Sequence, residues 1–172
     1  ALFQISLDEF GSPTTIDELF TLNIDESGNT ITTGQPGALV VSGDDLHILV
    51  TDSVGGDRFY TYGGNRLPTD GARETFLPAM SPILGFAACG DQMIAGGNGG
   101  AIEISTDSGT TWVSIVSPTT NDITSAEIVD GRYWVTDALG GVYFTANEGA
   151  DWTTITLPGS TNVTDLVFSG DD

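Results

Sequence analysis

The side chains of this chain that could do chemistry are mostly carboxylates. Its 172 residues include 24 Asp and Glu against four Lys and Arg, which gives a formal net charge of -20. Pairs such as Asp44 with Asp45, or Glu148 with Asp151, have the composition of a general acid and base for glycoside hydrolysis. A chain this acidic supplies such pairs by chance, so the pairs alone do not predict an enzyme.

The other reactive residues are too few for the common catalytic and metal sites. His47 is the only histidine and Cys89 the only cysteine, which argues against zinc clusters, an internal disulfide and a Ser-His-Asp triad. Cys89 ends an apolar run and is predicted to be a small core residue. His47 is expected on the outward or interblade side of a strand. Calcium would suit the carboxylates, but no Asp-x-Asp-x-Asp-Gly loop occurs, so no cofactor is predicted.

The charge balance also limits the partners. The basic residues are Arg58, Arg66, Arg73 and Arg132. Such a negative chain repels phosphate backbones and anionic lipids, so neither nucleic acid nor a membrane surface is expected as a partner. No apolar run is long enough for membrane insertion. The acidic surface is either simply solvated or faces cations or a basic partner. No signal peptide is visible, and export stays open because a cleaved one leaves no trace.

Two octets 40 residues apart share one pattern, and they lie between β-like segments. They are Ser105-Thr106-Asp107-Ser108-Gly109-Thr110-Thr111-Trp112 and Thr145-Ala146-Asn147-Glu148-Gly149-Ala150-Asp151-Trp152. Alternating apolar residues precede each octet, and a β-rich run that ends at a proline follows it. The four prolines of this frame, at positions 36, 78, 118 and 158, are spaced 42, 40 and 40 residues apart.

Tight turns fall at one place in each repeat. Glycine stands beside aspartate in residues 42–45, 89–92, 129–132 and 169–172, as hairpin turns require. Gly28 and Gly64 mark degenerate octets. Four short antiparallel strands in about 40 residues predict an all-β, propeller-type repeat domain. The one weak helical signal, over residues 15–20, is worth at most one turn.

These signals divide the chain into one domain, 1–172, with about four blades. The repeats run roughly over 1–36, 37–78, 79–118 and 119–158, and residues 159–172 supply a strand that closes or continues the ring. When the C-terminal turn at 169–172 is followed by residues 2–11, the two together match the pattern of residues 42–55, with the same Ser-Gly-Asp-Asp turn and leucine, aspartate and glycine at the same places. We therefore expect residues 163–168 to pair beside residues 2–7, which would remove the exposed sheet edges.

The octets resemble the Asp-box, or bacterial neuraminidase repeat, Ser/Thr-x-Asp-x-Gly-x-Thr-Trp. Residues 105–112 match every defined position, whereas residues 145–152 depart at Asn147 and Asp151. The resemblance implies a β-propeller in which the octets are structural turns rather than sites. The residues expected to carry that structural role are Ser105, Asp107, Gly109, Thr111, Trp112, Thr145, Asn147, Gly149 and Trp152.

Sialidases also carry Asp-boxes, so hydrolysis has to be weighed. Similar enzymes use three arginines to hold the substrate carboxylate, a tyrosine–glutamate pair and an aspartate. Arg66-Leu67-Pro68 is close to their first arginine motif, but only three arginines remain to complete the clamp. The chain is also about half the usual length, so it is expected not to be an enzyme.

The predicted function is a structural or interaction module that acts through protein–protein contacts. The first expectation is a phage virion component, either a capsid decoration or a tail-associated protein. The alternatives are a secreted or periplasmic scaffold, resembling the photosystem assembly-factor propellers, and a carbohydrate-binding module. A homo-oligomer is compatible with the sequence.

Overall fold

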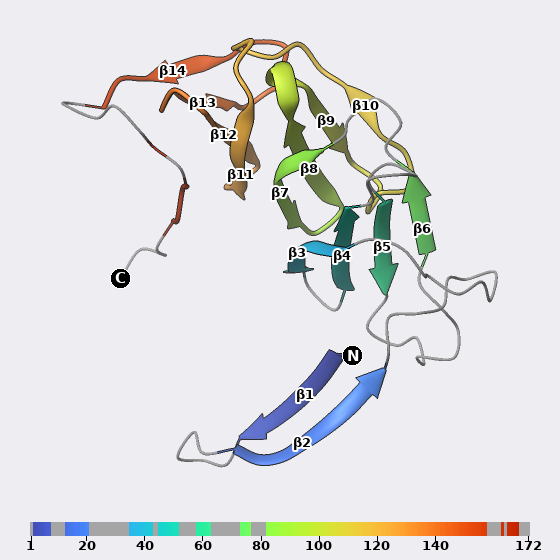
Figure 1. Ribbon diagram of the computed structural model, residues 1–172. Helices are drawn as coiled ribbons and strands as arrows, with labels where there is room; N and C mark the ends of the chain where they lie inside the picture. Colours follow the sequence, from blue (N-terminus) through green and yellow to red (C-terminus); the bar gives the residue numbers. More distant parts are fainter. Residues whose placement is uncertain are drawn as a thin grey trace.

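The strands of this chain form antiparallel sheets that follow one another along the sequence (Figure 1). The computed structural model describes residues 2–7, 13–20, 35–42, 45–51, 58–62, 73–76, 82–157, 163 and 165–168. An N-terminal hairpin of β1 (Leu2–Leu7) and β2 (Pro13–Phe20) comes first. Three four-stranded sheets, here sheets I, II and III, follow it.

Each four-stranded sheet is a meander whose strands pair in chain order. Sheet I contains β3 (Gln35–Ser42), β4 (Asp45–Thr51), β5 (Arg58–Tyr62) and β6 (Arg73–Phe76). Sheet II contains β7 (Ile83–Cys89), β8 (Gln92–Gly97), β9 (Ile102–Ser105) and β10 (Val113–Ser114), with the 3-10 helix η2 (Asn98–Gly100) between β8 and β9. Sheet III contains β11 (Ile123–Val129), β12 (Arg132–Asp137), β13 (Val142–Thr145) and β14 (Thr153–Ile155).

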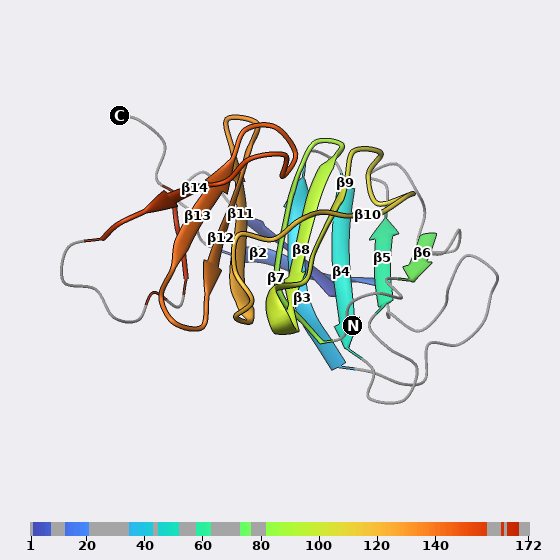
Figure 2. The same cartoon turned by 90° about the horizontal axis from the view of Figure 1, so that it is seen from above.

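The sheets stand side by side around a common axis. Figure 1 looks roughly along this axis and shows β3, β7 and β11 innermost and β6, β10 and β14 on the outside. Figure 2 shows the three sheets next to one another in a view turned by 90°. The strands thus alternate in direction from the axis to the rim, as the strand–turn–strand pattern of the sequence predicts.

The turns between the first two strands of sheets II and III have the predicted geometry. Gly90 has a φ of 59°, and Asp130 and Gly131 have φ of 51° and 69°. Two-residue hairpins favour such positive φ because the turn then matches the twist of the strands. The turn predicted at 169–172 lies outside the described residues, as do the degenerate octets at Gly28 and Gly64.

An irregularity recurs near the start of each innermost strand. The pairing register shifts between Pro36 and Ala38 in β3, between Ile83 and Gly85 in β7, and between Ile123 and Ser125 in β11. Such bulges leave one residue out of the ladder and turn its side chain to a new direction. In sheets II and III these residues are Leu84 and Thr124, which stand 40 residues apart.

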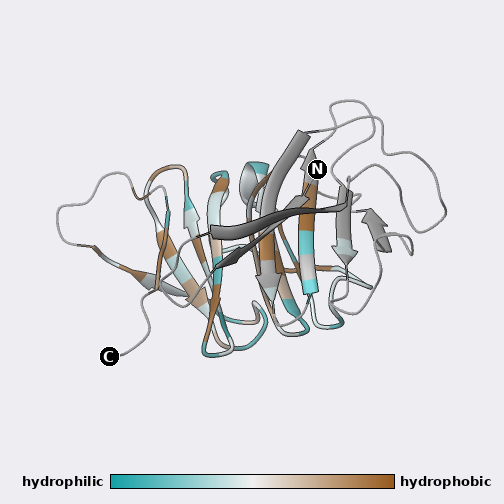
Figure 3. Ribbon diagram, turned by 90° about the horizontal axis from the view of Figure 1, so that it is seen from below, coloured by the Kyte–Doolittle hydropathy of each residue, from teal (hydrophilic) through white to brown (hydrophobic). Residues whose placement is uncertain are grey.

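The cores lie between sheets rather than inside one. Between sheets II and III, sheet II contributes Ala87, Ile94, Ile102 and Ile104, and sheet III contributes Ile123, Ala126, Ile128, Tyr133 and Val135. A smaller cluster of Leu49, Ile83 and Ala95 joins sheets I and II. Figure 3 shows hydrophobic (brown) stretches in the coloured strands, with hydrophilic (teal) residues both between them and in turns. Burial of these apolar surfaces holds the neighbouring sheets together.

Two local predictions were wrong. Cys89 is exposed rather than in the core, because it is the last residue of β7 and stands at the hairpin, beyond the buried part of the strand. Residues 15–20 belong to β2 and not to a helical turn, since Ile16 pairs with Ile5 of β1. For His47 the prediction allowed an outward or an interblade position. His47 is fully buried, which excludes the outward position, and its Nδ1 lies 3.2 Å from Thr61 Oγ1.

The predicted pairing of residues 163–168 beside residues 2–7 is not present among the described residues. There β1 pairs with β2 alone, and residues 165–168 belong to no strand. They lie against sheet III instead. Asp165 Oδ1 accepts a hydrogen bond from Ser125 Oγ at 2.8 Å, and the rings of Phe168 and Trp134 have centroids 5.1 Å apart.

Candidate functional site

The first octet folds into a closed hydrogen-bonded turn after β9. Ser105 Oγ donates to Asp107 Oδ1 at 2.8 Å and accepts from Gly109 N at 2.9 Å. Asp107 Oδ1 also accepts from Thr111 N at 2.8 Å, and its Oδ2 accepts from Thr111 Oγ1 at 2.7 Å. These bonds, first of all the one from the Thr111 backbone, hold the pKa of Asp107 below its ordinary value. The polar groups of the octet therefore serve the turn itself.

The second octet repeats this arrangement after β13. Thr145 Oγ1 donates to Asn147 Oδ1 at 2.8 Å and accepts from Gly149 N at 3.0 Å, and Asp151 N donates to Asn147 Oδ1 at 3.0 Å. Gly149 has a φ of 84°, and a Cβ there would lie 2.6 Å from Ile115 Cδ1 of sheet II. The positive φ favours glycine, and a side chain at this position would also require Ile115 to shift. Asn147 and Asp151 thus fill the places of Asp107 and Thr111 in the same turn.

The two octet tryptophans lie between sheets. Trp112 packs against the cluster that joins sheets I and II. Trp152 packs against the cluster between sheets II and III, and its Nε1 donates to Val116 O at 2.7 Å. Both indoles are half-buried. Each tryptophan therefore connects its own sheet to the one before it, and the octet residues act in the assembly of the fold.

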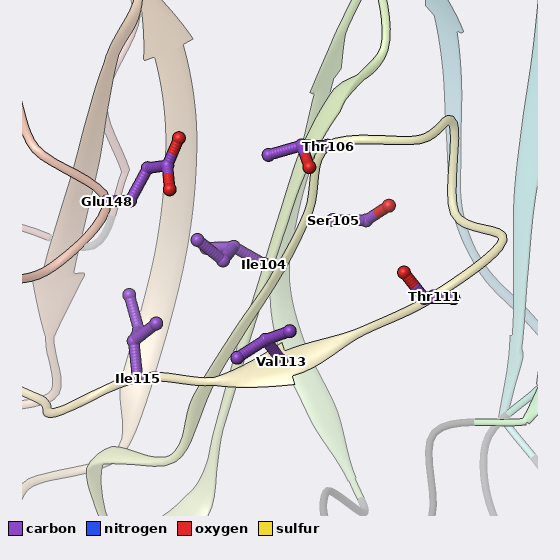
Figure 4. A pocket seen from close by; sticks show the side chains of 7 residues that line it. All are labelled: Ile104, Ser105, Thr106, Thr111, Val113, Ile115 and Glu148. Atoms are coloured by element: carbon purple, nitrogen blue, oxygen red, sulfur yellow. The ribbon is translucent and has the colours of Figure 1, made fainter.

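A small hollow lies at the rim between the two octets (Figure 4). It has a volume of about 190 Å³, and Ile104, Val113 and Ile115 form its apolar part. The Glu148 side chain reaches toward it from the second octet, as Figure 4 shows. The hollow is smaller than typical ligand pockets, and we name it the outer hollow.

A larger concave surface lies at the innermost strands, and we name it the inner groove. Its volume is about 390 Å³, and it is lined by residues 84–86 of β7, residues 124–127 of β11 and Asp165. β7 and β11 come close to each other here. A Cβ on Gly85 would stand only 2.8 Å from the carbonyl carbon of Ser125. The bulged residues Leu84 and Thr124 are both part of the lining. The bulges therefore direct side chains into the groove.

The inner groove is lined by apolar, hydroxyl-bearing and acidic residues. Leu84 is 44% exposed although it is a large apolar residue, and Phe86 beside it is half-buried. The lining also includes Glu127 and Asp165. Burial first, and then the charge of Asp165, raise the pKa of Glu127 above its ordinary value. No basic residue is part of the lining.

The described arginines belong to strands of sheets I and III. In the pairing of β5 with β6, Arg58 stands opposite Phe76 and Arg73 opposite Thr61, so the two arginines are at opposite ends of the pair. Arg132 begins β12 in sheet III, and its guanidinium carbon lies 5.8 Å from the centroid of the Phe144 ring. Arg66 lies outside the described residues.

Sequence reasoning missed Asp137, which is 1% exposed at the end of β12. Its Oδ1 accepts hydrogen bonds from the backbone N–H groups of Leu139 and Gly141, and its Oδ2 accepts from the side chains of Thr119, Asn121 and Tyr143. Burial opposes its ionisation, but the bonds from Asn121, Gly141, Thr119 and Leu139 outweigh burial and lower the pKa of Asp137. An aspartate two residues before a turn N–H is a local signal for this arrangement.

In the described part of the chain, no three His, Cys, Asp or Glu side chains come together in a way that could hold a metal ion. Nor do these residues include a helix of the length and apolar character that crossing a membrane requires.

The comparisons with known proteins bear on the fold. No protein-family model and no curated protein matches the sequence. Among solved structures, the chain is similar to YCF48 bound to D1 peptide, with 15% identity and a TM-score of 0.56 over 72% of this chain and 40% of that one. YCF48 from Cyanidioschyzon merolae matches 72% of this chain and 38% of its own at 18% identity, with a TM-score of 0.49. The chain thus spans about 40% of the first structure, and its all-β fold is of the β-propeller type, as predicted.

Proposed function

We propose that this chain is a non-enzymatic interaction module that binds other proteins at the inner groove. The observation that carries the proposal is the groove itself, where two sheets and residue 165 form a surface of about 390 Å³ with an exposed leucine and two carboxylates. Ligand sites are commonly concave and apolar with a few polar groups. The solved YCF48 structure holds a D1 peptide, and this supports a protein ligand for a propeller of this type.

The separation of the described arginines supports a function other than sialoside hydrolysis. A carboxylate clamp needs several arginines around one point, whereas Arg58 and Arg73 stand at opposite ends of a strand pair and Arg132 lies in another sheet. The octet geometry supports a further proposal, that the octets are Asp-box repeats. Their serine or threonine, Asx residue and glycine all take part in the hydrogen bonds that close the turn.

For the setting, we propose a phage virion, with the chain as a capsid decoration or tail-associated protein. A small, acidic, lysine-free β module with a single cysteine suits such an assembly. A secreted or periplasmic scaffold is the second candidate, favoured by the YCF48 likeness of the fold. A position of the gene beside capsid or tail genes would favour the virion. A precursor with a signal peptide would favour the secreted or periplasmic scaffold.

The test of the function has a binding arm and a catalytic arm. The intact chain is used to capture proteins from its native source, and each captured protein is purified and titrated against the chain by calorimetry. We expect one partner to bind with a measurable dissociation constant, and no turnover of sialosides or other glycosides. Turnover that disappears in Arg66→Ala would overturn the proposal, and so would the failure of every purified candidate to bind.

We also propose that the propeller has four blades and that residues 163–168 provide the innermost strand of the last one, beside β1. Gly85, Ser125 and Asp165 are spaced by 40 residues. Gly85 lies close to the Ser125 backbone, and the Ser125 side chain in turn contacts Asp165 through a hydrogen bond. In addition, Phe168 covers Trp134 of sheet III, where Ile128 packs with Ile94 one repeat earlier. An isolated two-stranded hairpin such as β1–β2 is only marginally stable in water, so a third strand would stabilise it.

Deleting residues 161–172 tests this closure. We expect the shortened chain to unfold at lower denaturant concentration and to self-associate, because it would expose unpaired strand edges and the face around Trp134. Light scattering on the intact chain should show a compact monomer. A discrete oligomer would indicate that the strand pairs with a second copy. Polydisperse aggregates of the intact chain, or a truncated chain of unchanged stability, would refute closure.

A further inference from the structure

The connection between β8 and β9 contains the only asparagine of the sequence that is followed by glycine. Asn98 and Gly99 are the first two residues of η2, and both are exposed. In such a pair the backbone nitrogen of the glycine can attack the side-chain amide carbon of the asparagine, because glycine has no Cβ that hinders the approach. Asparagine is for this reason among the thermolabile residues of proteins. The pair is therefore a candidate for spontaneous covalent modification.

The surroundings of this pair leave the asparagine side chain free to react. Among the described residues, no hydrogen bond holds the side-chain amide of Asn98. Asn121 and Asn147 are different, because their amides are bound to Asp137 and within the second octet. A Cβ on Gly99 would meet no atom within 4 Å, so the space beside the glycine is open. Of the asparagines that the structure describes, Asn98 is thus the one whose side chain can turn toward the next residue.

The nitrogen that would attack is held by a carboxylate from the connection between sheets II and III. Gly99 N donates to Asp122 Oδ1 at 2.7 Å. Asp122 is itself held in place, because its backbone carbonyl accepts from Ala138 N at 2.8 Å. Attack requires the nitrogen to lose its proton, and a nearby negative charge disfavours that loss. A carboxylate is also far too weak a base to remove an amide proton. The hydrogen bond to Asp122 therefore opposes the reaction.

We propose that Asn98 is a deamidation site and that Asp122 is the positioning residue that slows the reaction in the folded protein. In the first step a bond forms between Gly99 N and Asn98 Cγ, and the bond from Cγ to Nδ2 breaks. The proton of Gly99 N ends on the leaving nitrogen, which departs as ammonia and leaves a succinimide ring. Water then opens the ring at either carbonyl and gives aspartate or isoaspartate at position 98. The inference is independent of the proposed function.

Either product would change how this connection packs. The new carboxylate would stand close to Asp122, which carries the same charge, and would weaken the bond between the two connections. Isoaspartate would also lengthen the backbone of a short turn. That turn is closed by bonds from Gly97 N to Ala101 O at 3.0 Å and from Ala101 N to Asn98 O at 3.2 Å. The modified protein should therefore be less stable than the fresh one.

The test is incubation of the intact protein in mildly alkaline buffer below its unfolding temperature, followed by peptide mapping with mass spectrometry. We expect aspartate and isoaspartate to accumulate at position 98, and no product in Asn98→Gln. In Asp122→Ala the rate should be about three to ten times higher, which corresponds to the loss of one hydrogen bond. Asp91→Ala is the matched control, because it also removes an exposed carboxylate that accepts one side-chain bond, from Ser108 Oγ at 2.7 Å. It lies at the other end of β8 and should react like the wild type.

The same measurement in denaturant separates the fold from the local sequence. The unfolded wild type and the unfolded Asp122→Ala should react at one common rate, which is faster than that of the folded wild type. Absence of product at position 98 in both the folded and the unfolded chain would refute the site. A folded Asp122→Ala that reacts no faster than the wild type would refute the role of Asp122. Equal acceleration in Asp91→Ala and Asp122→Ala would refute it as well, since the effect would then follow from general loss of stability or charge.

Discussion

Replacing Asp137 with alanine is expected to lower the free energy of unfolding by about 3–4 kcal/mol. The side chain is 1% exposed, and the change would leave several polar groups without their acceptor. These are the N–H groups of Leu139 and Gly141 and the side chains of Thr119, Asn121 and Tyr143. A buried donor left without a partner costs about 1–3 kcal/mol. These hydrogen bonds are only partly buried, so water satisfies some of the donors and reduces the sum.

The effect should be large because Asp137 joins two parts of the fold. Leu139 and Gly141 belong to the turn between β12 and β13, whereas Thr119 and Asn121 lie in the connection from sheet II to sheet III. Chemical denaturation of Asp137→Ala measures the loss. Asp122→Ala is the matched control, because the exposed Asp122 carboxylate accepts a single bond, from Gly99 N at 2.7 Å, and should cost about 1 kcal/mol. Equal midpoints for the two variants would contradict the assigned role.

The same residue predicts a pH dependence. The folded-state pKa of Asp137 lies below its ordinary value of 3.8. Its ionised form therefore contributes stability in full above the ordinary value, and this contribution is lost as the pH falls through the folded-state pKa. The stability gap between the wild type and Asp137→Asn should hold at neutral pH and narrow below 3.8. A gap that is constant down to the acid transition would show that the carboxylate is not what stabilises the turn.

Much of the fold was predictable because its signals are local. The turn at residues 129–132 needs positive φ, and the sequence places aspartate and glycine there. The octets at 105–112 and 145–152 form hydrogen bonds within themselves, so each octet is recognisable from its local sequence. The spacing of 40 residues between them therefore indicated the repeat. Residues 15–20 failed as a local signal. Ile16, Leu19 and Phe20 are spaced as on a helix, but pairing with β1 sets the conformation.

The inner groove could not be predicted because its residues meet only through packing. Leu84 and Thr124 line the inner groove because a bulge shifts each of them out of the ladder. The residue types in these two strands do not predict a bulge. Asp165 reaches Ser125 across 40 positions of sequence. Asp137 is different. Its bond to Leu139 N is a local Asx turn that the sequence does indicate, while its bonds to Thr119 and Asn121 depend on how sheets II and III meet.

The second large effect is expected from Trp152→Ala, which should lower the free energy of unfolding by about 2–4 kcal/mol. The indole packs against the cluster between sheets II and III, and its N–H donates to Val116 O at 2.7 Å. Truncation of a tryptophan in a core costs about 3–5 kcal/mol. The estimate is lower here because Trp152 is only half-buried.

Two variants separate packing from hydrogen bonding at this position. Trp152→Phe keeps an aromatic ring but loses the N–H, so it should cost about 1 kcal/mol. Val116→Ala keeps the accepting carbonyl and removes a side chain that is 79% exposed, so it should change stability by less than about 0.5 kcal/mol. Hydrogen exchange should show loosened amides in β10 and β14 before those of β8 and β12. Equal denaturation midpoints for Trp152→Ala and Val116→Ala would show that the octet tryptophan does not join the two sheets. The buried cluster between sheets II and III would then hold them together without it.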